Sequence, residues 1–131
     1  ARQLSGEYSL RKAAEIILNM GPKYLIIKKG EHGSLLFDQK EMFFAPALPL
    51  RNVLDPTGAG DSFAGGFIGY LAKTKDISFE NMKKAVVNAS AMASFCVEKF
   101  GTQKLTEIDH KDVGLRINEF ARLVQTDVLL K

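Results

Sequence analysis

The chain has 131 residues, of which 46% are hydrophobic and 25% charged, a balance typical of one globular domain with a real core. A net charge of +3 without any basic run argues against a nucleic-acid partner, and no apolar stretch approaches the length of a membrane span. The single cysteine, Cys96, excludes an internal disulfide, so we expect a cytoplasmic protein in which this thiol is buried and inert.

The first predicted elements are a helix and a buried strand. Apolar residues at helical spacing predict a helix from Leu10 to Met20, with Ser9 as its N-cap and Gly21-Pro22 as its stop. The short apolar run Tyr24–Ile27 predicts a strand buried on both faces of a parallel sheet. This order of elements is typical of an α/β fold.

A hairpin and three helices are predicted next. Residues 34–37 and 42–45 indicate the two strands of the hairpin. After a glycine cluster, Phe63, Phe67, Ile68 and Leu71 recur on one helical face up to residue 72. A long helix is predicted over residues 81–97, with Ser78 or Asn81 as its cap, and a last one over about residues 110–123.

The segment with recognisable chemistry is Asp55-Pro56-Thr57-Gly58-Ala59-Gly60-Asp61, where a strand end turns into a helix. The first amides of a helix have no internal partner, and glycines let an anion approach them, so the turn suits a phosphate. A carboxylate beside an anion site suggests that Asp61 accepts the proton of an attacking hydroxyl. Asp61 as a simple helix cap explains the spacing equally well.

A dinucleotide-binding fingerprint is the main rival interpretation. Residues 58–64 fit its G-x-G-x-x-A variant, but the fingerprint needs a buried strand that ends in an acidic residue about twenty positions later. The candidates Asp76 and Glu80 lie in a polar, turn-like stretch. The sequence contains neither a Walker phosphate loop nor a G-x-S-x-G elbow. Phosphate binding therefore remains the favoured interpretation.

Residues 55–68 resemble the C-terminal signature of the PfkB family, the ribokinase-like carbohydrate and nucleoside kinases. The resemblance implies the C-terminal part of a ribokinase-like, three-layer α/β/α fold, with residues 1–131 as one part of a larger domain. It implies an enzyme that transfers a phosphoryl group from ATP, with Mg²⁺, to a hydroxyl of a small sugar or nucleoside. Asp61 would be the catalytic base, and the amides of Gly58, Ala59 and Gly60 would form the anion hole.

The same resemblance suggests further ligand contacts. The turn formed by Gly30, Glu31, His32 and Gly33 is similar to a G-x-x-G turn near the nucleotide, although a plain tight turn explains it nearly as well. Asn88 lies in a helix that resembles the small-residue helix lining the adenine pocket of these kinases, and simple helix packing is its alternative role. The Asp55 carboxylate and the Thr57 carbonyl correspond to a site for a monovalent cation such as K⁺, which residues 100–102 could complete.

Members of this family are much longer, and the opening residues 1–6 resemble the helix that follows a magnesium-placing N-x-x-E motif. We therefore expect a fragment that lacks the substrate-choosing half and is inactive alone. Its strand at residues 24–27 is expected to expose apolar area and favour self-association, or a homodimer of the parent. A non-catalytic nucleotide-binding or regulatory module of the same fold is the alternative function.

Overall fold

The structure is a computed structural model that describes residues 2–50, 58–98 and 109–125. The chain divides into two compact units, residues 1–47 and residues 48–131, and each unit is described by itself. Among the helices of the described ranges, none combines the length and the apolar character needed to cross a membrane.

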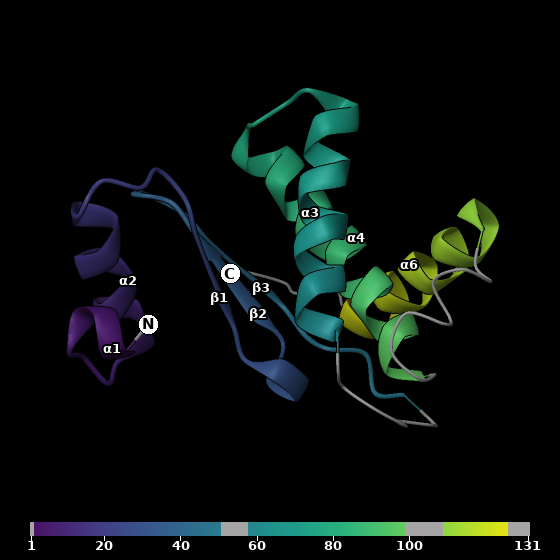
Figure 1. The fold of residues 1–131 in the computed structure, drawn as a ribbon, viewed down its shortest axis with the longest axis horizontal. Coiled ribbons are helices and arrows are strands. Elements are labelled where there is room, and N and C mark those ends of the chain that lie inside the picture. The colour runs from purple at the N-terminus through teal and green to yellow at the C-terminus, as the bar shows by residue number, and fades with distance from the viewer. Residues whose placement is uncertain (1, 51–57, 99–108, 126–131) are drawn as a thin grey trace, which may run out of the picture. The chain divides into compact units, whose positions relative to one another are not determined.

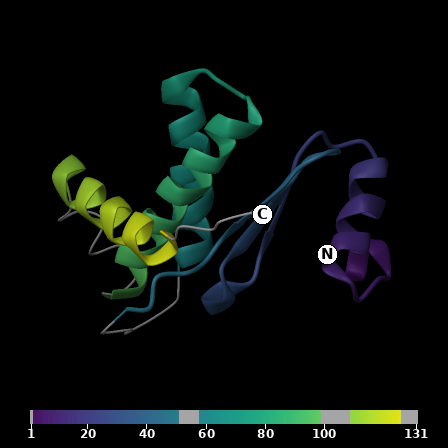
Figure 2. The same cartoon turned by 180° about the vertical axis from the view of Figure 1, so that it is seen from behind.

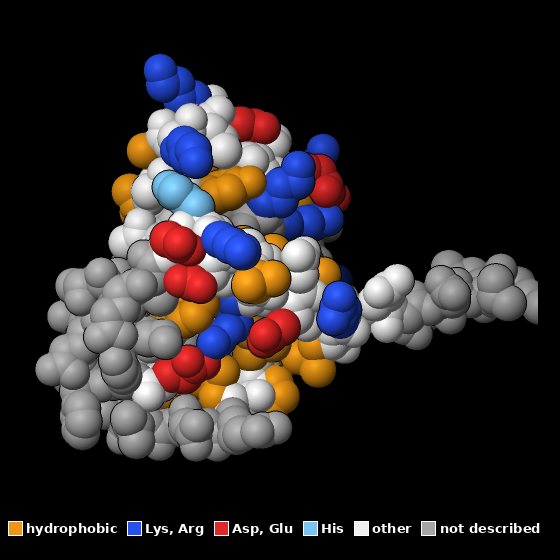
Figure 3. All heavy atoms as spheres, turned by 90° about the vertical axis from the view of Figure 1, so that its right-hand side faces the viewer, with side chains coloured by type: hydrophobic (Ala, Val, Ile, Leu, Met, Phe, Trp, Pro, Cys, Tyr) orange, Lys and Arg blue, Asp and Glu red, His pale blue; other side chains and the backbone are white. Residues whose placement is uncertain are grey.

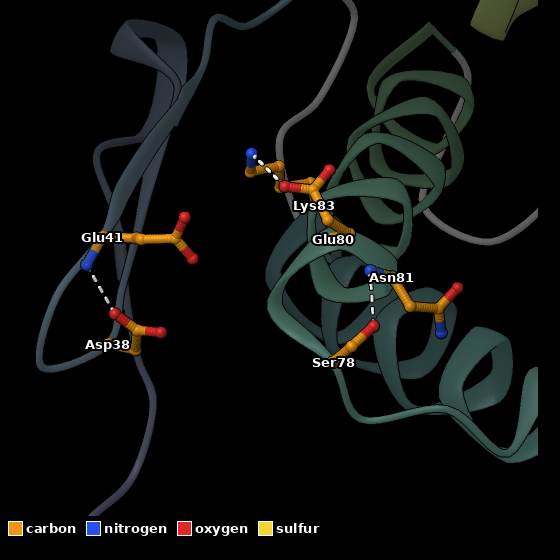
Figure 4. Close-up of polar contacts among 6 residues, drawn as sticks. All are labelled: Asp38, Glu41, Ser78, Glu80, Asn81 and Lys83. Carbon is orange, nitrogen blue, oxygen red and sulfur yellow. Dashed lines mark hydrogen bonds and ion pairs between the residues drawn. The ribbon is translucent and has the colours of Figure 1, made fainter.

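The N-terminal unit combines two helices with a three-stranded sheet (Figure 1). Its elements are α1 (Arg2–Ser5), α2 (Leu10–Asn19), β1 (Leu25–Lys28), β2 (Ser34–Phe37) and β3 (Met42–Ala45). Ser9 caps α2 as predicted, since its hydroxyl accepts a hydrogen bond from the amide of Lys12. The hairpin has the predicted bounds, and the Asp38 carboxylate accepts hydrogen bonds from two amides of its loop, including that of Glu41 (Figure 4).

β1 pairs with the first strand of the hairpin. β1 begins one residue later than predicted, and its partner among the described residues is β2, which runs antiparallel to it. Opposed residues of antiparallel strands share a face, so the register Leu25–Phe37 and Ile27–Leu35 directs four apolar side chains to one side. Ile27 and Phe37 pack there against Ala14 and Leu18 of α2, and these four residues form the core of this unit. A short apolar run predicts a strand but cannot specify the direction of its neighbour.

The turn between β1 and β2 is a single 3₁₀ turn, Gly30–His32, closed by a hydrogen bond from the Lys29 amide to the Gly33 carbonyl. Gly33 has a φ of 88° and packs against β3. A Cβ atom at this position would lie 2.4 Å from the Ala45 carbonyl oxygen, so the position has room for glycine alone.

The described residues of the second unit form the helices α3 (Ala59–Thr74), α4 (Phe79–Glu98) and α6 (His110–Val124). Helices α3 and α4 lie side by side (Figures 1 and 2). Ser78 rather than Asn81 caps α4, because the Ser78 hydroxyl accepts from the Asn81 amide (Figure 4). The Asn81 side chain is buried and donates to the Thr74 hydroxyl and the Asp76 carbonyl, which fixes the connection between the two helices.

Glycine 66 brings α3 and α4 close together. A Cβ atom at Gly66 would lie 3.2 Å from the Cα atom of Ala89, and the side-chain amide of Asn88 donates to the Gly66 carbonyl at 3.2 Å. This close approach accounts for a glycine inside a helix. The predicted apolar face of α3 is only partly correct, since Phe63 is buried whereas Ile68 is 62% exposed.

Helix α6 begins at a reciprocal capping box of Asp109 and Asp112. Phe120 of α6 is buried, whereas Val124 is 47% exposed. On the face of the molecule shown in Figure 3, basic and acidic side chains lie interspersed with apolar ones. This mixture agrees with the absence of a basic run in the sequence.

Candidate active site

The candidate phosphate-binding turn lies at the start of α3. Gly58 is the N-cap and has a left-handed φ of 83°, a conformation that glycine adopts without strain. The Ser62 amide donates to the Gly58 carbonyl at 2.9 Å, which is the first i to i−4 hydrogen bond of the helix. The amides of residues 59–61 therefore precede the helical ladder, at the end where the helix dipole is positive.

Asp61 is the third residue of α3 and is exposed to solvent. Asp61 is not the N-cap of α3, because Gly58 occupies that position. A carboxylate in the first turn of a helix is still favoured by the dipole. The geometry thus places one accessible carboxylate beside a glycine-rich turn.

Helix α4 lies directly behind this turn. A Cβ atom at Gly58 would lie 3.5 Å from the Sγ atom of Cys96, which is fully buried as predicted. Asn88, two turns earlier in α4, uses its amide nitrogen to bind the backbone of α3. This contact demonstrates helix packing for Asn88, and its proposed adenine contact stays a prediction.

The G-x-x-G turn belongs to the other compact unit. Hydrogen bonds from the His32 amide to the Lys29 carbonyl and from the Gly33 amide to the Gly30 carbonyl close this turn. The Glu31 side chain is exposed and lies 3.6 Å from the imidazole of His32. These bonds account for a tight turn into a hairpin, so nucleotide contacts of Gly30, Glu31 and Gly33 also stay predictions.

The candidate cation ligands Asp55 and Thr57, and the turn of residues 100–102, lie outside the described residues. Within the described ranges, no group of three or more His, Cys, Asp or Glu side chains is arranged to hold a metal ion.

The close approach of Cys96 to the Cβ position of Gly58 is the feature of the site that the sequence did not predict. These residues lie far apart in the chain, and their approach depends on how α4 packs on α3. Apolar periodicity identifies the buried face of each helix, but it does not identify which residues meet.

A family of known proteins matches most of the chain. The family model described as "pfkB family carbohydrate kinase" matches residues 1–109. The chain is 42% identical over 73 residues to a cytidine kinase of Thermococcus kodakarensis, an alignment that covers 53% of this chain and 26% of that protein.

Two solved structures confirm the predicted fold. A Salmonella enterica aminoimidazole riboside kinase, complexed with aminoimidazole riboside and an ATP analogue, superimposes with a TM-score of 0.73 and 28% identity over 88% of this chain and 38% of that chain. A ribokinase of Thermotoga maritima has a TM-score of 0.72 and 29% identity over 89% of this chain and 37% of its own. The chain thus spans about a quarter to two fifths of the length of these relatives.

Proposed function

Because the chain belongs to the pfkB family of carbohydrate kinases, we propose that it carries the phosphate-binding turn and the general base of an ATP-dependent kinase. The acceptor is a hydroxyl group of a small sugar or nucleoside. The observation that carries this proposal is the start of α3, where an exposed Asp61 follows a left-handed Gly58 and two small residues. Residues 1–131 form the C-terminal part of one kinase domain, and this part alone does not turn over substrate.

In the proposed reaction, backbone amides bind the phosphoryl group and a side chain acts as the base. The amides of Gly58, Ala59 and Gly60 stabilise the negative charge that develops on the transferring phosphoryl group. Asp61 accepts the proton of the substrate hydroxyl. At the same time the hydroxyl oxygen bonds to the γ-phosphorus of ATP, and the bond between that phosphorus and the leaving ADP oxygen breaks. Small residues in the turn leave the backbone accessible to the phosphoryl oxygens.

The other proposed contacts bind the nucleotide and the metal ions. Gly30, Glu31 and Gly33 approach the nucleotide, and the face of α4 at Asn88 lines the adenine pocket. The turn fits a phosphate, since no side chain larger than a methyl group precedes Asp61 in α3. Mg²⁺, bound to the ATP phosphates, supplies charge neutralisation. K⁺ would bind at Asp55 and Thr57, beside the anion hole.

The test replaces Asp61 by asparagine in the full-length protein. Asp61→Asn keeps the shape of the side chain and removes the base, so kcat with a sugar or nucleoside acceptor is expected to fall by about 10²- to 10⁴-fold. ATP affinity is expected to stay unchanged, because the base acts on the acceptor hydroxyl. Steady-state kinetics over a panel of acceptors and ATP binding by calorimetry measure the two quantities.

Asp76→Asn is the matched control. It makes the same chemical change just beyond the opposite end of α3, and its kcat is expected to equal that of the unmutated protein. Near-normal turnover in Asp61→Asn would refute the role of Asp61. ATP binding without turnover in the unmutated protein would instead favour a nucleotide-binding or regulatory module.

A further inference from the structure

Arg116 of α6 forms ion pairs, a hydrogen bond and a contact with an aromatic ring. Its side chain is only 12% exposed and forms an ion pair with Glu98 near the end of α4. Its guanidinium also donates to the Ser94 hydroxyl at 2.8 Å, and its Cζ atom lies 4.1 Å from the centre of the Phe95 ring. A weaker pair joins it to Glu119 at 3.8 Å within α6.

These contacts join α6 to the last turns of α4. A planar guanidinium can bind a carboxylate and a hydroxyl and stack on a ring at the same time, which an ammonium group cannot do. Ser94 is itself fixed, because its hydroxyl donates to the Ala91 carbonyl at 2.6 Å. Removing a guanidinium from such a site leaves the other polar groups without their partner in a poorly hydrated place.

The same stretch of α4 supports the candidate phosphate-binding turn. Cys96 lies between Ser94 and Glu98 and is fully buried, and its Sγ atom would lie 3.5 Å from a Cβ atom added at Gly58, the N-cap of α3. The side chain that fastens this stretch comes from α6, which lies outside the family match at residues 1–109. A helix beyond the family segment therefore holds the part of α4 on which the turn rests.

We propose that Arg116 is a positioning residue for the phosphate-binding turn, acting through residues 94–98 of α4 and the close approach of Cys96 to the Cβ position of Gly58. This inference rests on the proposed kinase function for its effect on turnover. Its structural part, that Arg116 holds the start of α3 in place, can be measured without any activity. Arg116 touches neither Gly58 nor Asp61 in this scheme and acts only through α4.

The test uses Arg116→Met in the full-length protein, since methionine keeps an apolar chain over Phe95 but removes the charge and the donors. Alkylation of Cys96 by iodoacetamide, followed by peptide mass spectrometry, is expected to accelerate about tenfold as α4 loosens. Hydrogen exchange of the Ser62 amide should accelerate with it, because that amide closes the first turn of α3. With the turn displaced, kcat is expected to fall about tenfold, with the KM for ATP within about twofold of normal.

Two further variants control this experiment. Arg122→Met changes an exposed arginine on the same helix and is expected to behave as the unmutated protein in all measurements. Arg116→Lys keeps the charge beside Glu98 and is expected to recover part of the lost kcat and of the Cys96 protection. A structural role without positioning would change unfolding but leave kcat of the folded enzyme unchanged.

The outcomes separate this inference from the proposed function. Unchanged rates of Cys96 alkylation and Ser62 amide exchange in folded Arg116→Met would overturn the inference. Faster alkylation and exchange with a normal kcat would overturn it as well. If Arg116→Met does not fold, Glu98→Gln should give smaller changes of the same sign in Cys96 alkylation, Ser62 amide exchange and kcat. No change in these quantities in Glu98→Gln would overturn the inference. If the unmutated protein transfers no phosphoryl group, the proposed function fails alone, and the Ser62 exchange rate still decides whether Arg116 positions the turn.

Discussion

Replacing Gly66 by alanine tests the close packing of α3 on α4. The new Cβ atom would lie 3.2 Å from the Cα atom of Ala89 and 3.2 Å from the Cγ atom of Met92. The Met92 side chain can rotate away, but Ala89 is fully buried and its backbone moves only if the helices separate. That separation would also stretch the hydrogen bond from Asn88 to the Gly66 carbonyl, which is 3.2 Å long.

Two opposing terms set the expected size of the effect. Alanine in place of glycine stabilises a helix interior by about 1 kcal/mol, whereas overpacking costs about 1–3 kcal/mol. Gly66→Ala is therefore expected to lower the free energy of unfolding by up to about 2 kcal/mol. Gly114→Ala is the matched control, since Gly114 is exposed in α6 and has no atom within 4 Å of its added Cβ.

The assay is equilibrium urea unfolding of the full-length protein, with both variants compared at neutral pH. Gly114→Ala is expected to be more stable than the unmutated protein by about 0.5–1 kcal/mol, so the two variants should differ by about 1–3 kcal/mol. Equal stability of Gly66→Ala and Gly114→Ala would refute the claim that glycine is required at the α3–α4 contact.

Two further predictions concern the connection between these helices. Asn81→Ala removes the hydrogen bonds to Thr74 and Asp76 and should lower the free energy of unfolding by about 1–2 kcal/mol in urea, whereas the exposed Asn118→Ala should change it little. Hydrogen bonds from the backbone and hydroxyl of Ser78 lower the pKa of Asp76. Its contribution to stability is therefore complete above the unfolded value of about 4 and disappears as pH falls through the lower folded pKa. Asp76→Asn should be less stable than the unmutated protein at pH 7 and approach it in acid unfolding series, and a pH-independent difference would contradict this.

Local signals in the sequence were sufficient for most elements. The cap at Ser9, the hairpin of residues 34–45 and the helix that follows Gly58 were predicted from a capping residue, a polar turn between two apolar segments, and glycine placement. Such signals act within a few residues, so they are available before any tertiary contact is known.

The errors and omissions concern contacts between distant residues. A buried apolar run does not state which strand pairs with it or in which direction, so the antiparallel pairing of β1 with β2 was not predicted. Helical periodicity placed Ile68 on a buried face, yet α4 covers the side of α3 that carries Gly66 and leaves Ile68 exposed. The capping choice for Asp61 was decided only by the backbone conformation of Gly58. The partners of Arg116 were not predicted, because no local pattern joins residues 94–98 to residue 116.

The two glycines of the G-x-x-G turn have unequal value for recognising related sequences. Gly30 has a φ of 57° and open space at its Cβ position, so asparagine, which tolerates the left-handed region, fits there at modest cost. A Cβ atom at Gly33 would lie 2.4 Å from the Ala45 carbonyl oxygen, so this position accepts no side chain while the hairpin keeps its register. A search pattern that weights both glycines equally would reject distant homologues with a changed first position and admit false ones with a changed second. Weighting Gly33 alone would follow the physical constraint, because the atoms that a Cβ there would meet belong to the backbone of residues 45 and 46.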